Sequence, residues 1–95
     1  MNKKFKEPLN TSVSTTRFVL EDKKDITIVF HLEDNYWSFT SNDRDDNWQE
    51  NERIVELEEI ISIDETVLQI ADLKEGWGAQ RKFKNDPWRI ALLPE

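Results

Sequence analysis

The N-terminal half of the chain alternates between apolar and polar positions in a way that predicts β-strands. Residues 13–20 are rich in Val, Thr, Ser and Phe, which suit a strand. In residues 26–32, Ile, Ile, Phe and Leu occupy every second position, the clearest period of two in the chain. Residues 36–41 follow with Trp37 and Phe39 on one face. Short polar segments separate the three runs, so the pattern predicts an antiparallel meander of three strands.

The spacing of apolar residues then changes and predicts helices. Leu57, Ile60 and Ile61 lie three and four positions apart, as on one face of a helix. Asp64 is suited to cap a second helix through its carboxylate. We therefore expect one or two short helices between residues 56 and 73, packed on one face of the sheet.

The remaining segments complete an α+β domain. Residues 77–83 and 88–92 predict a C-terminal hairpin, while residues 53–56 suit either a short strand or the entry to a helix. The expected fold class is α+β, with a mainly antiparallel sheet of about five strands. Residues 1–11 are polar and carry Pro8, which predicts a flexible arm. The single domain then covers residues 12–95.

Composition supports one small packed core. The chain has 95 residues, of which 37% are hydrophobic and 11% aromatic, more large rings than a disordered chain normally carries. It contains no cysteine, so no disulfide can form. The basic start lacks the apolar stretch of a signal peptide, and no apolar run approaches the roughly 20 residues that span a bilayer. These features predict a cytoplasmic protein.

The negative charge is concentrated in one segment. The net charge is −7, and residues 33–59 hold 10 acidic but only 2 basic side chains. Such a surface repels phosphate groups, which argues against a nucleic acid or an anionic membrane as partner. It would attract a basic protein. The alternative is a solvated face that only keeps the domain soluble.

A tryptophan among acids marks the candidate interaction site. Residues 42–52 form a polar loop by composition, with Trp48 as its one large ring. Tryptophan is enriched at the centres of protein interfaces, and surrounding carboxylates would suit a basic, partly apolar partner surface. In the alternative interpretation Trp48 folds back over the sheet edge and anchors the loop. The predicted partner-binding residues are Asp43, Asp45, Asp46, Trp48, Glu50, Glu58 and Glu59.

Candidates for catalysis are few. His31 is the only histidine, and without cysteine it is the sole candidate base for an activated nucleophile. It lies on the face of its strand opposite Ile28 and Phe30, where an exposed or hydrogen-bonded structural histidine is the expected alternative. Many carboxylates are present, but no apolar cleft is indicated that would shift their pKa values. We expect no catalytic residue, and a small hydrolase is the third hypothesis.

The same acidic loop partly matches a calcium-binding pattern. Asp43, Asp45 and Asn47 occupy the first, third and fifth positions of an EF-hand-like pattern. The sixth position, which requires glycine, is Trp48, and the twelfth, which requires glutamate, is Ile54. The sequence thus predicts neither a dedicated metal site nor a cofactor.

Several motifs occur in an order that is informative as a set: Val13-Ser14-Thr15; Trp37-x-Phe39 before the acidic loop Ser41 to Asp46; Asn51 with Ile54 and Leu57; Ile60 followed by Asp64; and Gly76 with Ala79 and Arg81. Over residues 13–90 this order resembles a family of small bacterial immunity-type proteins of polymorphic toxin systems, formerly a domain-of-unknown-function family. The resemblance implies an α+β fold and neutralisation of a toxin by binding, and it supplies no catalytic residues.

Besides the hypothesis of a small hydrolase, we consider two hypotheses of function. In the first, the chain is a non-enzymatic protein-binding module, an immunity protein that neutralises a basic toxin domain through its acidic loop. In the second, it is a structural or regulatory domain whose acidic surface confers only solubility. Exposed edge strands would permit pairing between copies, and the oligomeric state stays open.

Overall fold

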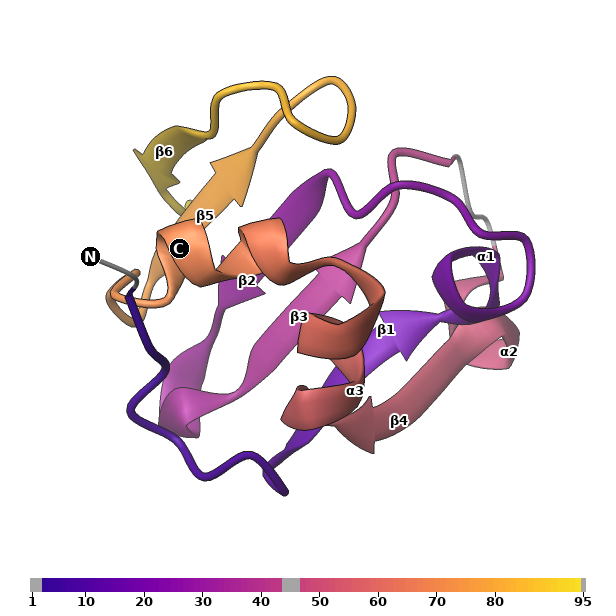
Figure 1. Cartoon of the computed structure of the whole chain (residues 1–95), viewed down its shortest axis with the longest axis horizontal. Helices are drawn as coiled ribbons and strands as arrows, with labels where there is room; N and C mark the ends of the chain where they lie inside the picture. The colour runs from indigo at the N-terminus through magenta and orange to yellow at the C-terminus, as the bar shows by residue number, and fades with distance from the viewer. Residues whose placement is uncertain (1–2, 44–46, 95) are drawn as a thin grey trace.

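Six short strands form a single mixed sheet with the order β4-β1-β3-β2-β5-β6 (Figure 1). The computed structural model describes residues 3–43 and 47–94. The strands are β1 (Ser12–Thr16), β2 (Ile28–His31), β3 (Trp37–Thr40), β4 (Glu52–Glu56), β5 (Trp77–Gln80) and β6 (Arg89–Leu92). The helical segments are α1 (Arg17–Leu20), η1 (Glu33–Asn35), α2 (Trp48–Asn51), α3 (Leu57–Ile63) and η2 (Glu65–Ile70), where η marks a 3-10 helix. The α+β class is confirmed.

The strand pairing is mainly antiparallel, as predicted, but the N-terminal meander is wrong. β2 and β3 form the expected hairpin, and β5 and β6 form the C-terminal hairpin. β1 does not pair with β2: it lies parallel to β3 on one side and antiparallel to β4 on the other. At the end of β1 the hydroxyl of Thr16 caps α1 by accepting a hydrogen bond from the backbone N–H of Val19 at 3.4 Å. The chain therefore leaves the sheet at residue 17 instead of making a hairpin turn.

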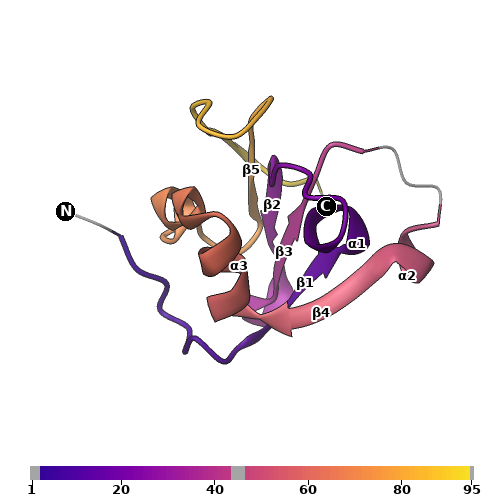
Figure 2. The same ribbon diagram turned by 45° about the vertical axis from the view of Figure 1, so that its right-hand side comes forward.

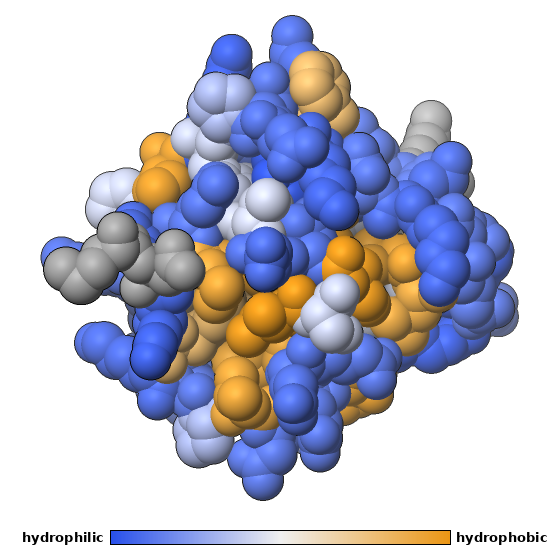
Figure 3. All heavy atoms as spheres, viewed as in Figure 1, coloured by the Kyte–Doolittle hydropathy of each residue, from blue (hydrophilic) through white to orange (hydrophobic). Residues whose placement is uncertain are grey.

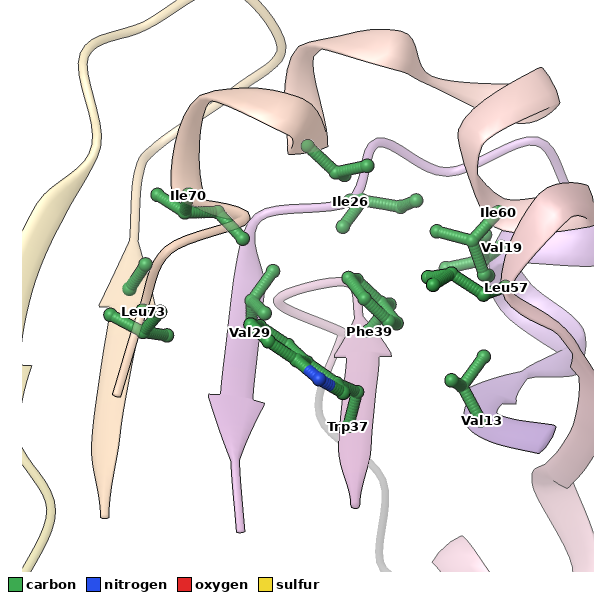
Figure 4. Packing of buried hydrophobic residues seen from close by; sticks show 12 residues of the cluster. Val13, Val19, Ile26, Val29, Trp37, Phe39, Leu57, Ile60, Ile70 and Leu73 are labelled. Carbon is green, nitrogen blue, oxygen red and sulfur yellow. The ribbon is translucent and has the colours of Figure 1, made fainter. Parts of the chain in front are cut away.

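One face of the sheet carries the hydrophobic core. Figure 2 shows α3 on one side of the strands, and Figure 4 shows side chains of the sheet and of the helical segments meeting between them. Val29 lies in this core, whereas its neighbours Ile28 and Phe30 lie on the opposite face and are partly or largely exposed. The period of two is confirmed in β2, although in the strand itself Val29 is buried and Phe30 of the more regular apolar row is exposed; Ile26 of that row is buried before β2 begins. The core residues are Val13, Val19, Ile26, Val29, Trp37, Phe39, Leu57, Ile60, Val67, Ile70, Leu73 and Ala79.

The helical segments predicted between residues 56 and 73 are present and pack on that one face. α3 inserts Leu57 and Ile60 into the core. Asp64 ends α3 and caps η2, since its Oδ1 accepts hydrogen bonds from the N–H and the hydroxyl of Thr66 at 3.0 and 2.6 Å. Within the described part of the chain, no helix has the length and apolar character that a bilayer span requires.

The N-terminal segment, which we predict to be flexible, makes defined contacts from Lys3 onward. The ring of Phe5 packs edge-on against Trp37, with 5.0 Å between centroids. The carbonyl of Leu9 accepts a hydrogen bond from the N–H of Glu58 at 2.9 Å. These contacts give residues 3–11 a position against the core and α3, while their flexibility stays a prediction.

Candidate functional site

Two large apolar side chains lie exposed among carboxylates along one edge of the sheet. Trp48 in α2 is 57% exposed, and Ile54 in the edge strand β4 is 56% exposed. We call the surface formed by Trp48, Glu50, Glu52, Ile54 and Glu56 the β4 edge surface. Glu50 and Glu56 are exposed and Glu52 is half-buried. This combination of apolar and acidic groups makes it the candidate interaction site.

A short helical turn positions Trp48 at the start of this surface. In α2, the carbonyl of Asn47 accepts hydrogen bonds from the N–H groups of Glu50 and Asn51. The N–H of Glu52 then bonds to the carbonyl of Trp48, so the tryptophan lies one turn before β4 begins. Arg17 in α1 donates to the side-chain oxygen of Asn51 at 2.6 Å, which fixes α2 beside α1 (Figure 1). Trp48 therefore stands on a supported turn and does not fold back over the sheet.

The strand β4 determines which side chains follow. Because successive side chains point to opposite faces of a strand, Glu52, Ile54 and Glu56 share one face, and Val55 on the other packs against the core. Ile54 is opposite Ser14 in the register with β1. The hydroxyl of Ser14 donates a hydrogen bond to Oε2 of Glu52 at 2.7 Å, which holds that carboxylate over the sheet.

The negative charge of Glu52 acts on the pKa of Tyr36, the only tyrosine of the chain. Burial raises the pKa of Tyr36 above its usual value of 10.0, and the negative charge of Glu52 raises it further. A hydrogen bond with Ser14 acts in the opposite direction. The Glu52 carboxylate thus lies close enough to the open face of the sheet to oppose a second negative charge there.

Arg53, the one arginine of β4, makes its hydrogen bonds to backbone carbonyls and its ion pair to a carboxylate outside β4. Nη1 of Arg53 donates to the backbone carbonyls of Glu50 and Glu52 at 2.8 and 2.9 Å. Its Nη2 lies 3.7 Å from the carboxylate of Glu21, which belongs to a different segment. With Glu50, Glu52 and Glu56 against this single arginine, the β4 edge surface keeps a net negative charge.

The residues predicted for partner binding are only partly brought together. Trp48 and Glu50 lie on the same turn, but Asp43 is half-buried and accepts a hydrogen bond from the hydroxyl of Ser41 at 2.6 Å. Asp45 and Asp46 lie outside the described residues. Ile54 was not predicted as part of the site, although the alternation across residues 52–56 could have indicated that it shares a face with Glu52 and Glu56.

Glu58 and Glu59 lie apart from this group. They are exposed in the first turn of α3, beyond the far end of β4, and five strand residues span about 16 Å. Glu58 lines a shallow hollow with Leu9, Ile61 and Ile63. Figure 3 shows hydrophobic residues reaching the surface in a band on the face that carries α3. The acidic residues 50–59 thus follow the edge of the sheet instead of forming one cluster.

His31 has contacts typical of a structural histidine. Its ring is 5% exposed and stacks on Trp37 with 3.9 Å between centroids. Nδ1 lies 2.6 Å from the carbonyl oxygen of Leu73, and Nε2 lies 3.1 Å from Oδ1 of Asn35. The carboxylate of Glu7 is 4.0 Å from Nε2. With both ring nitrogens engaged, the imidazole links β2 to the segment after η2 and to the hairpin loop.

The calcium pattern of the sequence lies on a different framework from that of an EF-hand. The strand β3 precedes Asp43, where an EF-hand has a helix, and the third-position residue Asp45 is outside the described residues. Among residues 3–43 and 47–94, no three side chains of His, Cys, Asp or Glu come together in an arrangement that could hold a metal ion.

Comparison with known proteins adds no assignment to this geometry: no protein-family model, no curated protein and no solved structure matches the chain.

Proposed function

We propose that the chain is a non-enzymatic protein-binding module whose β4 edge surface docks on a basic protein. The observation that carries the proposal is the exposure of Trp48 and Ile54, more than half of each, within a row of carboxylates. Isolated exposed apolar residues are common on proteins, but an exposed tryptophan held on a supported turn is a typical interface anchor.

The two kinds of side chain have different roles in this binding. Burial of Trp48 and Ile54 supplies affinity, since fully burying a large apolar side chain stabilises a complex by about 1.5–3 kcal/mol. Glu50 and Glu56 attract a basic surface over a distance and raise the rate of encounter. Glu58 and Glu59 extend the same charge beyond the end of β4. The binding surface is therefore an elongated edge and not a pocket.

The partner we propose is a basic toxin domain. The resemblance to immunity-type proteins of polymorphic toxin systems supports this class of partner, and neutralisation by binding requires no catalytic group. An acidic protein with an exposed anchor can occlude a basic nuclease-like or otherwise cationic surface. We place this action in the cytoplasm, where reducing conditions do not affect a chain without cysteine.

Affinity capture tests the proposal. The full chain is immobilised and exposed to a lysate of its native host, in parallel with the double variants Trp48→Ala/Ile54→Ala and Glu50→Lys/Glu56→Lys. The matched control is Glu33→Lys/Glu65→Lys, which changes the charge equally at two exposed positions outside the β4 edge surface. We expect a basic protein to be captured by the wild type and the control and lost with both edge variants.

The competing hypothesis gives a different result. If the acidic surface confers only solubility, the folded wild-type chain captures no basic protein, or all variants capture the same proteins equally. Circular dichroism of each variant verifies that it is folded. Loss of binding in the control pair as well would indicate dependence on net charge alone and would contradict the assignment to β4.

A further inference from the structure

The two edges of the sheet differ in how they are protected. β4 carries Glu52, Arg53 and Glu56, and charged side chains are a common defence of an edge strand against pairing. β6 has the sequence Arg-Ile-Ala-Leu, and all four of its residues are exposed. In Figure 1 β6 forms the margin of the molecule, with no described element beyond it. β6 is thus an exposed, largely apolar edge.

Hydrogen bonds to β5 determine which backbone groups of β6 remain available for pairing with another strand. The N–H of Leu93 donates to the carbonyl of Gly76 at 2.8 Å, on the side of β5. Backbone groups point to alternate sides along a strand, so Ala91 also faces β5, while Ile90 and Leu92 direct their N–H and C=O groups to the open side. An unpaired row of this kind is a template for another strand.

From this arrangement we infer that β6 is a dimerisation edge, which pairs antiparallel with β6 of a second copy about a two-fold axis at Ala91. Ile90 of one copy then forms reciprocal hydrogen bonds with Leu92 of the other, and the symmetry repeats this pair. The pairing keeps the strand as it is in the monomer, because Ile90 and Leu92, whose backbone groups face outwards, pair with each other across the axis. Such an interface is isologous and closes at two chains.

The side chains are compatible with the same axis. Ile90 and Leu92 are 54% and 66% exposed, and they share the sheet face of their β5 partners Ala79 and Trp77. In the dimer, Ile90 and Leu92 of both copies meet on one face as an apolar cluster. Beside the strand lies a shallow hollow that is lined by Leu32, Glu33, Tyr36, Gly76, Leu92, Leu93 and Pro94.

Charge does not by itself select a second copy at this edge, since both copies present the same basic segment, but it favours β6 over the acidic β4 as the edge at which two copies meet. Residues 77–94 carry four basic and one acidic side chain in a chain with net charge −7. The acidic β4 lies at the opposite edge of the sheet, five strand spacings or about 24 Å away, whereas charges are screened over about 8 Å at physiological ionic strength. Arg89 is opposite Leu93 of the second copy and not opposite the other Arg89. Two copies can therefore meet at β6 with their acidic surfaces far apart.

The area that β6 can bury determines how tightly the two copies are expected to associate. A stable interface buries roughly 800 Å² on each partner, more than a four-residue strand supplies by itself. We therefore expect a reversible dimer that dissociates at micromolar concentration. Both β4 edge surfaces remain free in it, so the dimer does not depend on the proposed function.

Sedimentation of the full chain tests the association. Between about 10 µM and 1 mM, the average mass should rise from one chain towards two and no further. The variant Ile90→Lys should remain a monomer throughout, because it places a charge in the apolar cluster. Phe83→Lys is the matched control, since Phe83 is 56% exposed but lies outside the strand, and it should associate like the wild type.

Cross-linking tests the register. In this pairing Ala91 faces Ala91 of the second copy as a non-hydrogen-bonded pair with about 4.5 Å between Cα atoms, within the range of a disulfide. The chain has no other cysteine, so Ala91→Cys should form a covalent dimer on mild oxidation at least tenfold faster than Phe83→Cys. Equal rates, a monomer at 1 mM, dimerisation of Ile90→Lys, or growth beyond two chains would each overturn the inference.

Discussion

The guanidinium of Arg81 lies 2.8 Å from the carboxylate of Asp64, Nη2 to Oδ2, and the two side chains are 0% and 3% exposed. Arg81 also donates to the carbonyl of Ile26 and to the hydroxyl of Thr66, and its guanidinium packs over the ring of Trp88. One side chain thus joins the segment before β2, the cap of η2 and the C-terminal hairpin. Both charged groups make further hydrogen bonds besides the one between them, which offsets the cost of burying them.

Loss of one member of this pair should destabilise the fold strongly. Arg81→Met leaves the carboxylate of Asp64 buried without its counter-charge, and we expect the free energy of unfolding to fall by about 3–5 kcal/mol. Urea denaturation followed by tryptophan fluorescence measures this change. Arg89→Met, at an exposed arginine, is the control and should change stability by less than about 0.5 kcal/mol. A small effect of Arg81→Met would mean that the pair contributes little.

The N-terminal segment should contribute to stability through Phe5. Phe5 contacts both Trp37 and Phe39, with centroid distances of 5.0 and 6.2 Å. Because the ring is only partly buried, Phe5→Ala should lower the unfolding free energy by about 2 kcal/mol, less than a fully buried phenylalanine. Leu9→Ala, at an exposed leucine of the same segment, should have little effect. Equal, negligible effects would indicate that residues 3–11 are a flexible arm in solution.

Tyr36 makes stability depend on pH in the alkaline range. Burial and the charge of Glu52 raise its pKa in the folded state above 10.0, so the unfolded chain loses the phenolic proton first. Stability from this group is complete below pH 10 and is lost as pH rises above it. Tyr36 is the only tyrosine, so absorbance of the phenolate titrates this single site. We expect a midpoint above 10.0 and a weaker alkaline loss of stability in Tyr36→Phe; a midpoint at or below 10.0 would contradict the assigned environment.

Glu52 can be tested by the same titration. Glu52→Gln removes the negative charge but keeps a side chain that accepts a hydrogen bond from Ser14. We expect the midpoint of Tyr36 to move downwards, because one of the two causes of its raised pKa is gone. Glu56→Gln, at the other end of β4, is the control with the same change of charge. An identical titration in wild type and Glu52→Gln would show that burial alone acts on Tyr36.

Local patterns were sufficient to predict the fold class, both hairpins and the helical segments near Asp64. They could not predict that α1 would follow Thr16, since residues 13–20 have strand-forming composition throughout and the burial of Val19 in the core depends on the whole fold. The order of strands depends on pairings between distant segments, such as β1 with β4. The buried face of β2 could not be predicted either, because Val29 and His31 are covered by segments from other parts of the chain, such as Leu73 and Glu7 beside His31.

In the candidate site, too, some residues could be predicted from local sequence and others depend on the fold. Trp48 and Glu50 were identified because an aromatic residue among acids is visible in a sequence. Ile54 was not, because its exposure follows from β4 being an edge strand whose other face packs on the core. The complete burial of Arg81 could not be predicted from local patterns, because it depends on its contacts with Asp64 and Trp88 in the folded chain.

The most direct measurement of the proposed binding through the β4 edge surface is calorimetric titration of the protein obtained by affinity capture with the wild-type chain and with Trp48→Ala. We predict that Trp48→Ala weakens binding about 30-fold, as expected for an anchor worth about 2 kcal/mol, and that Phe83→Ala leaves the Kd unchanged. Unchanged affinity of a folded Trp48→Ala protein would contradict the proposed surface.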